Sequence, residues 1–116
     1  MHALLLTLGS YGDVHPFLGL GAQLRARGHR VTLLTNDHFR SLAEAQGLGF
    51  EPIGSAEEYH QLSQDPELWH SRRGGFRVME VLGAYLRQAY DVLASLAGPE
   101  SVVAASTLGF AARILH

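Results

Sequence analysis

The sequence predicts an α/β fold, in which a parallel sheet carries helices on both faces. Short apolar runs alternate along the chain with longer segments whose apolar residues recur at helical spacing. Glycines mark most junctions between the two kinds of segment. The first run, residues 2–8, is apolar without alternation, which is typical of a strand buried on both faces. The resulting order β-α-β-α-β-α-β-α requires right-handed crossovers between parallel strands.

The first helix is expected over residues 16–28. Pro16 suits its first position, because the missing N–H costs no hydrogen bond there, and Gly28 suits its end. The glycines of Gly19-Leu20-Gly21 are explained by close packing of this helix on the sheet. The residues expected on its inner face are Phe17, Leu20, Gly21 and Leu24.

A second strand is expected over residues 30–35, followed by a second helix. Either Asn36 or Asp37 caps this helix, Phe39 lies on its inner face in the core, and Gly47 ends it. The pattern therefore repeats the strand and helix that precede it.

The rest of the chain completes the alternation. Residues 50–53 predict a short strand whose proline places it toward an edge of the sheet. Residues 55–75 are polar and are expected to be irregular and mobile. Residues 76–97 predict a long amphipathic helix with one apolar stripe. A buried strand is expected at 101–105, and a further helix begins at 107.

Composition bounds the function. The 116 residues suffice for one domain, and 47% hydrophobic residues indicate a globular chain. A formal net charge of -2 offers no basic excess for nucleic acid. The absence of cysteine excludes disulfides and thiolate nucleophiles and favours a cytoplasmic location. A signal peptide is not expected, because no Lys or Arg precedes the apolar run at the N-terminus and a glycine turn follows it directly. A membrane span is not expected, since no apolar run approaches about 20 residues.

The domain is expected to be incomplete. A doubly wound domain has more strands than the four predicted, and residues 113–116 lie inside a helix with no cap. A truncated sheet exposes an edge and an apolar face, which favours self-association or pairing with another chain. Peripheral contact with a membrane is a further expectation.

The most informative segment is the junction of the first strand and helix, Gly9-Ser10-Tyr11-Gly12-Asp13-Val14-His15-Pro16. Ligands of parallel sheets bind beyond the carboxyl ends of the strands, where this junction lies. A dinucleotide site needs G-x-G-x-x-G here, whereas the chain has G-x-x-G-D. Asp13 would place negative charge where a pyrophosphate needs positive potential.

Asp13 suits proton abstraction from a bound hydroxyl instead. The alternative is that Asp13 merely caps the first helix, although Pro16 at the first position would make His15 the cap. His15 either contacts a ligand or serves as a cap or surface residue. Ser10 lacks the G-x-S-x-G context of a nucleophile.

Two aromatic residues flank the polar segment, and the histidines show no metal pattern. Trp69 and Phe76 either line an apolar acceptor pocket or cover the core beneath a long loop. The seven histidines have no i,i+4 pairing and no carboxylate pattern for zinc, so no metal and no cofactor are expected.

The junction Gly9 to Phe17, followed by Gly28-His29-Arg30-Val31-Thr32 and Thr35, resembles the N-terminal domain of GT-B glycosyltransferases. The branch it resembles contains sterol glucosyltransferases, macrolide and glycopeptide antibiotic glycosyltransferases, and the rhamnosyltransferase B chains of rhamnolipid synthesis, which are the most similar. The resemblance extends over nearly the whole chain.

The resemblance implies two Rossmann-like domains facing a cleft, with residues 1–116 forming an incomplete acceptor-side domain and the donor-binding domain absent. It implies an inverting, metal-independent transfer of a hexose from a UDP- or TDP-sugar to a hydroxyl of an apolar small molecule or lipid. Asp13 matches the general base, and Ser10 and Gly12 match the loop near the donor. His15, Trp69 and Phe76 are the expected acceptor contacts.

Plant-type relatives have a histidine in place of Asp13, oriented by an aspartate after a later strand. Residues 104–107 of this chain contain no acid, so Asp13 must act directly. Two rival functions remain at this point. One is a nucleotide-binding or dinucleotide-binding oxidoreductase domain, and the other is a non-catalytic assembly module.

Overall fold

The computed structural model describes residues 1–7, 11–66, 72 and 74–105. Within these residues a parallel sheet has the strand order β3-β2-β1-β4. The strands are β1 (His2–Leu6), β2 (Arg30–Thr35), β3 (Gly49–Pro52) and β4 (Ser101–Ala105). The predicted α/β fold, with β3 at an edge of this sheet, is confirmed. The expected helix after residue 107 lies outside the described residues.

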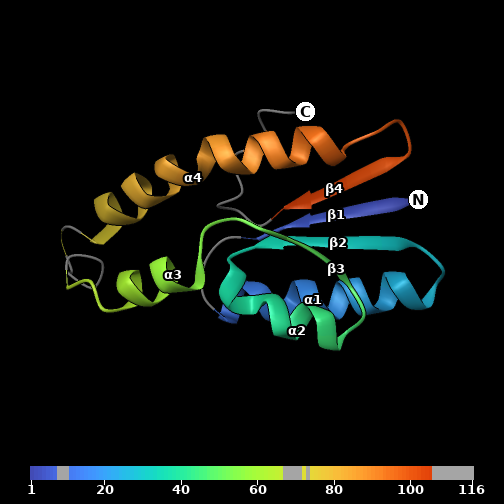
Figure 1. The fold of residues 1–116 in the computed structure, drawn as a ribbon, viewed down its shortest axis with the longest axis horizontal. Coiled ribbons are helices and arrows are strands. Elements are labelled where there is room, and N and C mark those ends of the chain that lie inside the picture. The colour runs from blue at the N-terminus through green and yellow to red at the C-terminus, as the bar shows by residue number, and fades with distance from the viewer. Residues whose placement is uncertain (8–10, 67–71, 73, 106–116) are drawn as a thin grey trace.

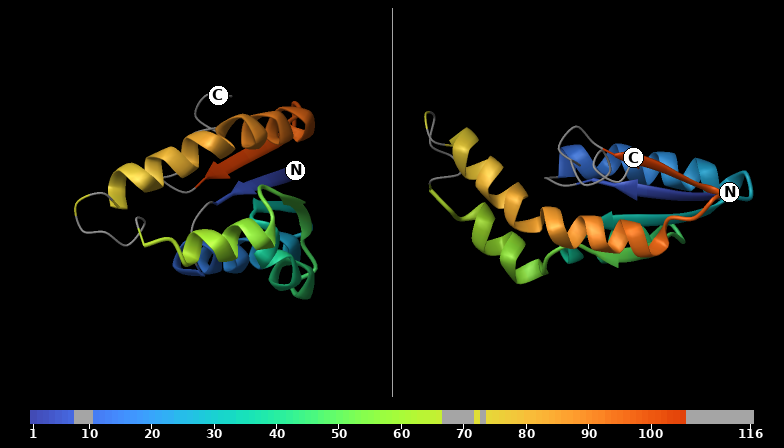
Figure 2. Two further views of the ribbon diagram at one scale, coloured as in Figure 1. Left: turned by 60° about the vertical axis from the view of Figure 1, so that its left-hand side comes forward. Right: turned by 90° about the horizontal axis from the view of Figure 1, so that it is seen from above.

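Helices cover both faces of the sheet, as Figures 1 and 2 show. One face carries α1 (Tyr11–Ala26) and α2 (Arg40–Ala45), and the other carries the long helix α4 (Gly74–Leu96). A short 3₁₀ turn, η1 (Asp37–Phe39), precedes α2, and α3 (Ala56–Ser63) follows β3. Figure 1 shows α3 and the first half of α4 extending past the carboxyl ends of the strands.

Alternation along the strands divides the core into two clusters. In β1, Ala3 and Leu5 pack toward α1 and α2, whereas Leu4 and Leu6 pack toward α4. This period of two explains why β1 is apolar at every position from Ala3 to Leu6. Burial of each large side chain contributes roughly 1.5–3 kcal/mol, so the sheet anchors the whole domain.

The structure corrects the first helix. It begins at Tyr11, five residues before the predicted start, so Pro16 lies inside the helix and His15 is not its cap. Val14 and Leu18 are its large buried side chains among residues 14–26, and Leu20, which was expected to face inward, is 44% exposed. A β-carbon at Gly21 would meet Leu48 at 2.8 Å, so close packing is confirmed there.

Asn36 caps the 3₁₀ turn η1, since its side chain accepts a hydrogen bond from the N–H of His38. The helix α2 begins after this turn, at Arg40, and has no side-chain cap of its own, so the predicted cap belongs to η1. Phe39 is fully buried, which confirms its core position. Leu93 and Ala89 of α4 are buried against the opposite face. The polar stretch 55–75 is not wholly irregular, because it contains α3.

None of the described helices is long and apolar enough to cross a membrane.

Candidate functional site

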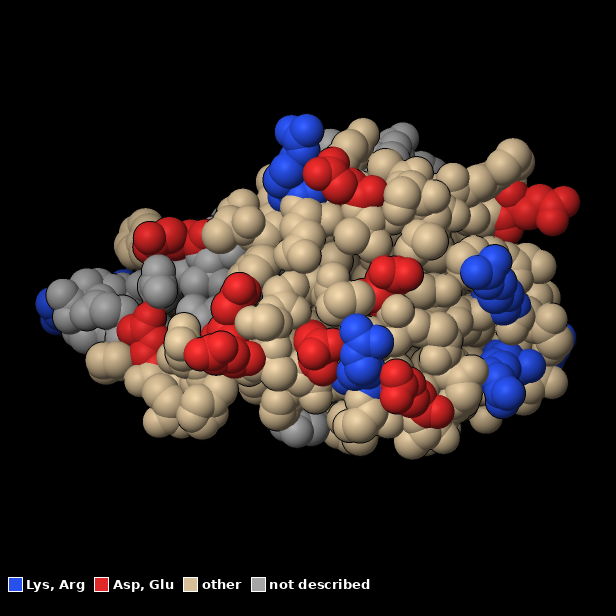
Figure 3. Space-filling model, viewed as in Figure 1, with Lys and Arg blue, Asp and Glu red and all other residues tan. Residues whose placement is uncertain are grey.

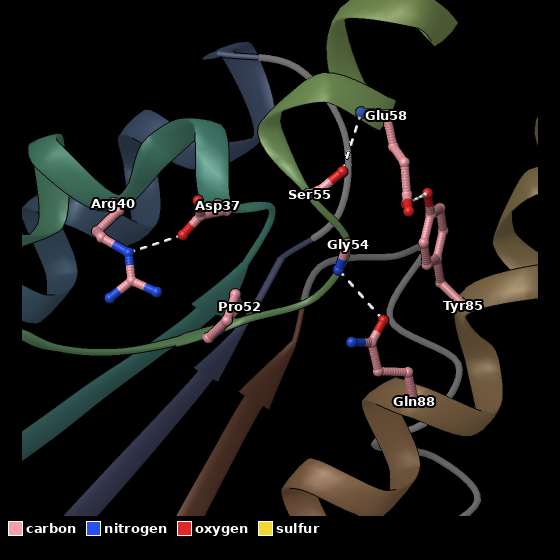
Figure 4. A pocket seen from close by; sticks show the side chains of 8 residues that line it. All are labelled: Asp37, Arg40, Pro52, Gly54, Ser55, Glu58, Tyr85 and Gln88. Atoms are coloured by element: carbon pink, nitrogen blue, oxygen red, sulfur yellow. Dashed lines mark hydrogen bonds and ion pairs between the residues drawn. The ribbon is translucent and has the colours of Figure 1, made fainter.

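An open pocket of about 460 Å³ lies beyond the carboxyl ends of β2 and β3, between α3 and α4. Ligands of parallel sheets bind at this edge. Figure 4 shows its lining side chains rising from η1 and α2, from the end of β3, and from the two helices. The lining residues are Asp37, Arg40, Pro52, Gly54, Ser55, Glu58, Tyr85 and Gln88.

A hydrogen bond joins the two helices across the pocket, since the hydroxyl of Tyr85 on α4 donates to Oε2 of Glu58 on α3. Burial first, and then the hydrogen bond to Glu58 and its negative charge, raise the pKa of Tyr85 to about 12. Tyr85 therefore keeps its proton at neutral pH and remains a donor.

Gly54 holds the end of β3 against both walls of the pocket. Its N–H donates to Oε1 of Gln88 at 3.2 Å, and its carbonyl accepts from the N–H of Asp37 at 3.3 Å. Its φ of +81° lies in the left-handed region that favours glycine. A β-carbon there would also lie 3.0 Å from Cε1 of Tyr85, so the position leaves no room for a side chain.

Ser55 and Asn36 fix the start of α3. The Ser55 hydroxyl accepts from the N–H of Glu58 at 3.1 Å, which caps the helix. The amide nitrogen of Asn36 donates to the carbonyl of Ser55 at 2.9 Å. The ring of Tyr59 stacks on His38, with 4.4 Å between centroids. Asn36 and His38, which directly follow β2, therefore hold this short helix in place.

The pocket carries more acid than base. Asp37 and Arg40 form an ion pair at 2.7 Å, whereas Glu58 bonds the neutral hydroxyl of Tyr85. In Figure 3 acidic side chains gather over α3 on this face of the molecule. The lining therefore favours neutral or positively charged groups over phosphates.

Two buried threonines end the strands beside this edge. Leu6 pairs with Leu34, so Thr7 and Thr35 follow in neighbouring positions of β1 and β2. Both are fully buried. The hydroxyl of Thr35 has no hydrogen-bond partner among the described residues. It shares its side of β2 with Val31 and Leu33, which face α1.

The structure describes only some of the residues predicted for the site. Asp13 and Gly12 lie in the first turn of α1, directly beyond the carboxyl end of β1. Asp13 is the third residue of this helix and not its cap. His15 is exposed on the same helix. Ser10 and Trp69 lie outside the described residues.

Phe76 does not cover the core as one interpretation held. Its side chain is 79% exposed near the start of α4, because this half of the helix extends past the sheet. Phe76 is also absent from the lining of the described pocket. The expectation that it contacts an acceptor stays a prediction.

Sequence reasoning missed the three side chains that line the pocket from α3 and α4, namely Glu58, Tyr85 and Gln88. Glu58 had a visible signal, because Ser55-Ala56-Glu57-Glu58 has the S-x-x-E pattern of a helix start. Tyr85 and Gln88 had none, since they lie on a helix far along the chain. Among the described residues, no three His, Asp or Glu side chains gather as metal ligands.

The profile of the glycosyltransferase family 28 N-terminal domain matches residues 3–116 of the chain. The chain belongs to this family. The match covers the β1–α1 junction, the pocket and the end of β4. It confirms the resemblance to a glycosyltransferase N-terminal domain and opposes the alternative of a dinucleotide-binding oxidoreductase domain. The particular likeness to rhamnosyltransferase B chains stays a prediction.

Several curated relatives of this family 28 domain match its sequence over part of its length. A sterol 3-beta-glucosyltransferase of Saccharomyces cerevisiae (strain YJM789) is 47% identical over 49 residues, which are 42% of this chain and 4% of that protein. The O-mycaminosyltylonolide 6-deoxyallosyltransferase of Streptomyces fradiae is 45% identical over 67 residues, 58% of this chain and 14% of that protein. The matches thus span a small part of each relative.

Solved structures share the fold of the family 28 domain. The calicheamicin glycosyltransferase CalG4 aligns with a TM-score of 0.72 and 28% identity, over 98% of this chain and 29% of that one. The glycosyltransferase of kitacinnamycin aligns with a TM-score of 0.70 and 24% identity, over 98% of this chain and 27% of that one. The second likeness concerns the fold alone.

Proposed function

We propose that the chain is the acceptor-binding half of an inverting, metal-independent glycosyltransferase. In this role it holds an acceptor while a hexose passes from a nucleotide diphosphate sugar to the acceptor's hydroxyl. The observation that carries the proposal is the family match over residues 3–116, together with the position of Asp13 where β1 meets α1. The relatives named as sterol and macrolide-type sugar transferases support an acceptor with a large apolar body.

The proposed chemistry assigns one role to each partner. Asp13 accepts the proton of the acceptor hydroxyl as its oxygen attacks the anomeric carbon, and the bond from that carbon to the diphosphate oxygen breaks. The helix N-terminus favours the ionised carboxylate. Ser10 and Gly12 lie near the donor in this account, and His15, Trp69 and Phe76 contact the acceptor.

The sheet order supports this placement. The chain moves outward from β1 to β2 and β3, and then returns to place β4 on the other side of β1. The point where the strand order reverses is where ligands of open α/β sheets bind. The segment that begins at Tyr11 follows β1 at this point, so Asp13 belongs to the edge that the proposal needs.

A transfer assay tests the proposal. The full-length protein is incubated with UDP-glucose or TDP-glucose and a sterol or hydroxy fatty acid, with and without EDTA. We expect a glycoside product whose anomeric configuration is inverted by NMR, at a rate that EDTA leaves unchanged. Absence of product with every donor and acceptor pair, or a retained configuration, would contradict the proposal.

A further inference from the structure

The pocket between α3 and α4 has hydrogen-bonding capacity that its internal contacts do not use. Gln88 uses its oxygen on Gly54, and its amide NH₂ donates to none of the described residues. The Ser55 hydroxyl accepts from Glu58 and can still donate. Glu58 uses one carboxylate oxygen on Tyr85, which leaves the other. Donors and acceptors therefore line both walls of the pocket.

The same pocket offers a flat apolar surface between these groups. The ring of Tyr85 is half-buried, and it lies so close to Gly54 that a β-carbon on Gly54 would be 3.0 Å from its Cε1. Pro52 adds an apolar contact below. A saturated ring with hydroxyls on its rim and C–H groups on its faces matches this arrangement, because its rim can bond the polar side chains while a face lies on the tyrosine.

The volume of the pocket and the charges that line it further restrict which ligand can bind there. The volume of about 460 Å³ falls within the roughly 300–1,000 Å³ of small-molecule sites. Asp37 and Glu58 are two carboxylates against the one guanidinium of Arg40. A nucleotide diphosphate would meet this negative lining at a cost, whereas a neutral sugar would not. The chemistry therefore favours a ring carried by the acceptor over the sugar of the donor.

We propose that this pocket binds a hydroxylated ring, a sugar or polyol unit that the acceptor carries apart from the hydroxyl that is attacked. This inference rests on the proposed function, because only that function makes the bound molecule an acceptor. It adds a polar part to an acceptor that was expected to be apolar. Glu58 and Gln88 are the residues that bind the rim, and Tyr85 supplies the face.

Binding tests the pocket without any turnover. Methyl β-D-glucopyranoside is titrated into the full-length protein and followed by saturation-transfer NMR. We expect saturation of the ring protons, and about tenfold weaker binding in Glu58→Gln or Gln88→Leu, the effect of losing one hydrogen bond to a charged or amide group. Arg87→Gln is the control, since Arg87 lies beside Gln88 in sequence with a side chain 88% exposed.

Melting temperatures of the variants show whether each still folds. No binding of the glucoside, or equal binding by the folded wild-type protein and both pocket variants, would overturn the inference. Titration with UDP-glucose separates the two sources of a sugar ring. If UDP-glucose displaces the glucoside and loses affinity equally in Glu58→Gln, the pocket holds the donor's sugar and the inference fails.

Transfer to paired acceptors separates this inference from the proposed function. 8-Hydroxyoctyl β-D-glucoside and 1-octanol both offer a primary hydroxyl on an alkyl chain, and only the first carries a sugar ring apart from that hydroxyl. We expect a higher kcat/KM for the glucoside, a preference that Glu58→Gln loses and Arg87→Gln keeps. If the protein binds the glucoside but transfers sugar to no acceptor, the pocket binds a sugar ring and the proposed function is wrong. If it transfers sugar without preferring the glucoside, the proposed function holds and the inference about the pocket is wrong.

Discussion

At the scale of single residues, Thr32 and Thr35 are two buried threonines of β2 that differ in the hydrogen bonding of their hydroxyls. Thr35 is fully buried, and its hydroxyl has no partner among the described residues. Thr32 is also buried, but its hydroxyl bonds Nε2 of His2 at 2.8 Å. A buried polar group without a partner costs about 1–3 kcal/mol.

Valine at these two positions is expected to have opposite effects. Thr35→Val removes the unpaired hydroxyl, so the free energy of unfolding should rise by about 1 kcal/mol. Thr32→Val breaks a hydrogen bond and should lower it by about 1 kcal/mol. Urea denaturation of both variants measures the difference. If Thr35→Val is the more damaging change, its hydroxyl has a partner in solution.

The bond between Thr32 and His2 also bears on charge. Burial first, and then the charges of Arg30 and the N-terminus, lower the pKa of His2 below its usual value of 6.5. The neutral ring is therefore favoured in the folded state. Because the unfolded state binds this proton more readily, His2 does not lower the free energy of unfolding above pH 6.5. Its protonation lowers that free energy as the pH falls below 6.5.

At the scale of elements, two glycines of α1 test the packing of the helix on the sheet. A β-carbon at Gly19 would meet nothing within 4 Å, whereas one at Gly21 would lie 2.8 Å from Cδ1 of Leu48. The sequence suggested close packing for both, and it was right for Gly21 alone. Gly21 lies seven and three residues after the buried Val14 and Leu18 and so shares their face of the helix, whereas Gly19 does not.

Alanine at these positions separates propensity from packing. Gly19→Ala should raise the free energy of unfolding by about 0.5–1 kcal/mol, since alanine restricts the unfolded chain and adds no clash. Gly21→Ala gains the same propensity but displaces buried Leu48, which costs about 1–3 kcal/mol. Thermal unfolding of the pair is the measurement. An equal gain from both changes would contradict the packing described for α1.

The strands were predictable because their signal is local. Apolar runs and flanking glycines place β1, β2 and β4 within a residue or two, and Asn36 does act as a cap, although of η1 and not of α2. Helix α3 was missed because it is only eight residues long and lies within a polar stretch of the chain. Non-local contacts hold it, namely the stacking of Tyr59 on His38 and the bond from Tyr85 to Glu58.

At the scale of the whole molecule, the parallel sheet places the candidate functional residues at the edge where its strands end. Parallel strands end together, so the residues after β1, β2 and β3 meet there although they are far apart in sequence. Asp13 follows β1, Asp37 follows β2, and Gly54 follows β3.

The pocket was less predictable than the fold for the same reason. The sequence indicated the edge and the β1–α1 junction, which local motifs reveal. It could not indicate that Tyr85 and Gln88 would face Glu58 and Gly54, since that depends on how α4 crosses the sheet (Figure 4). An acceptor site was therefore assigned to aromatic residues that flank the polar segment, and Phe76 lies outside the described pocket.

The central claim is that Asp13 is the base of a sugar transfer, and the turnover of Asp13→Asn in the full-length protein tests it most directly. Asparagine keeps the shape and cannot accept the proton, so kcat should fall by roughly 10²–10⁴-fold with KM little changed. Asp91→Asn is the matched control, because Asp91 is an exposed partner of Arg87 on α4 and its loss should leave turnover unchanged. If Asp13→Asn turns over within a few-fold of the unmodified protein, Asp13 is not the base.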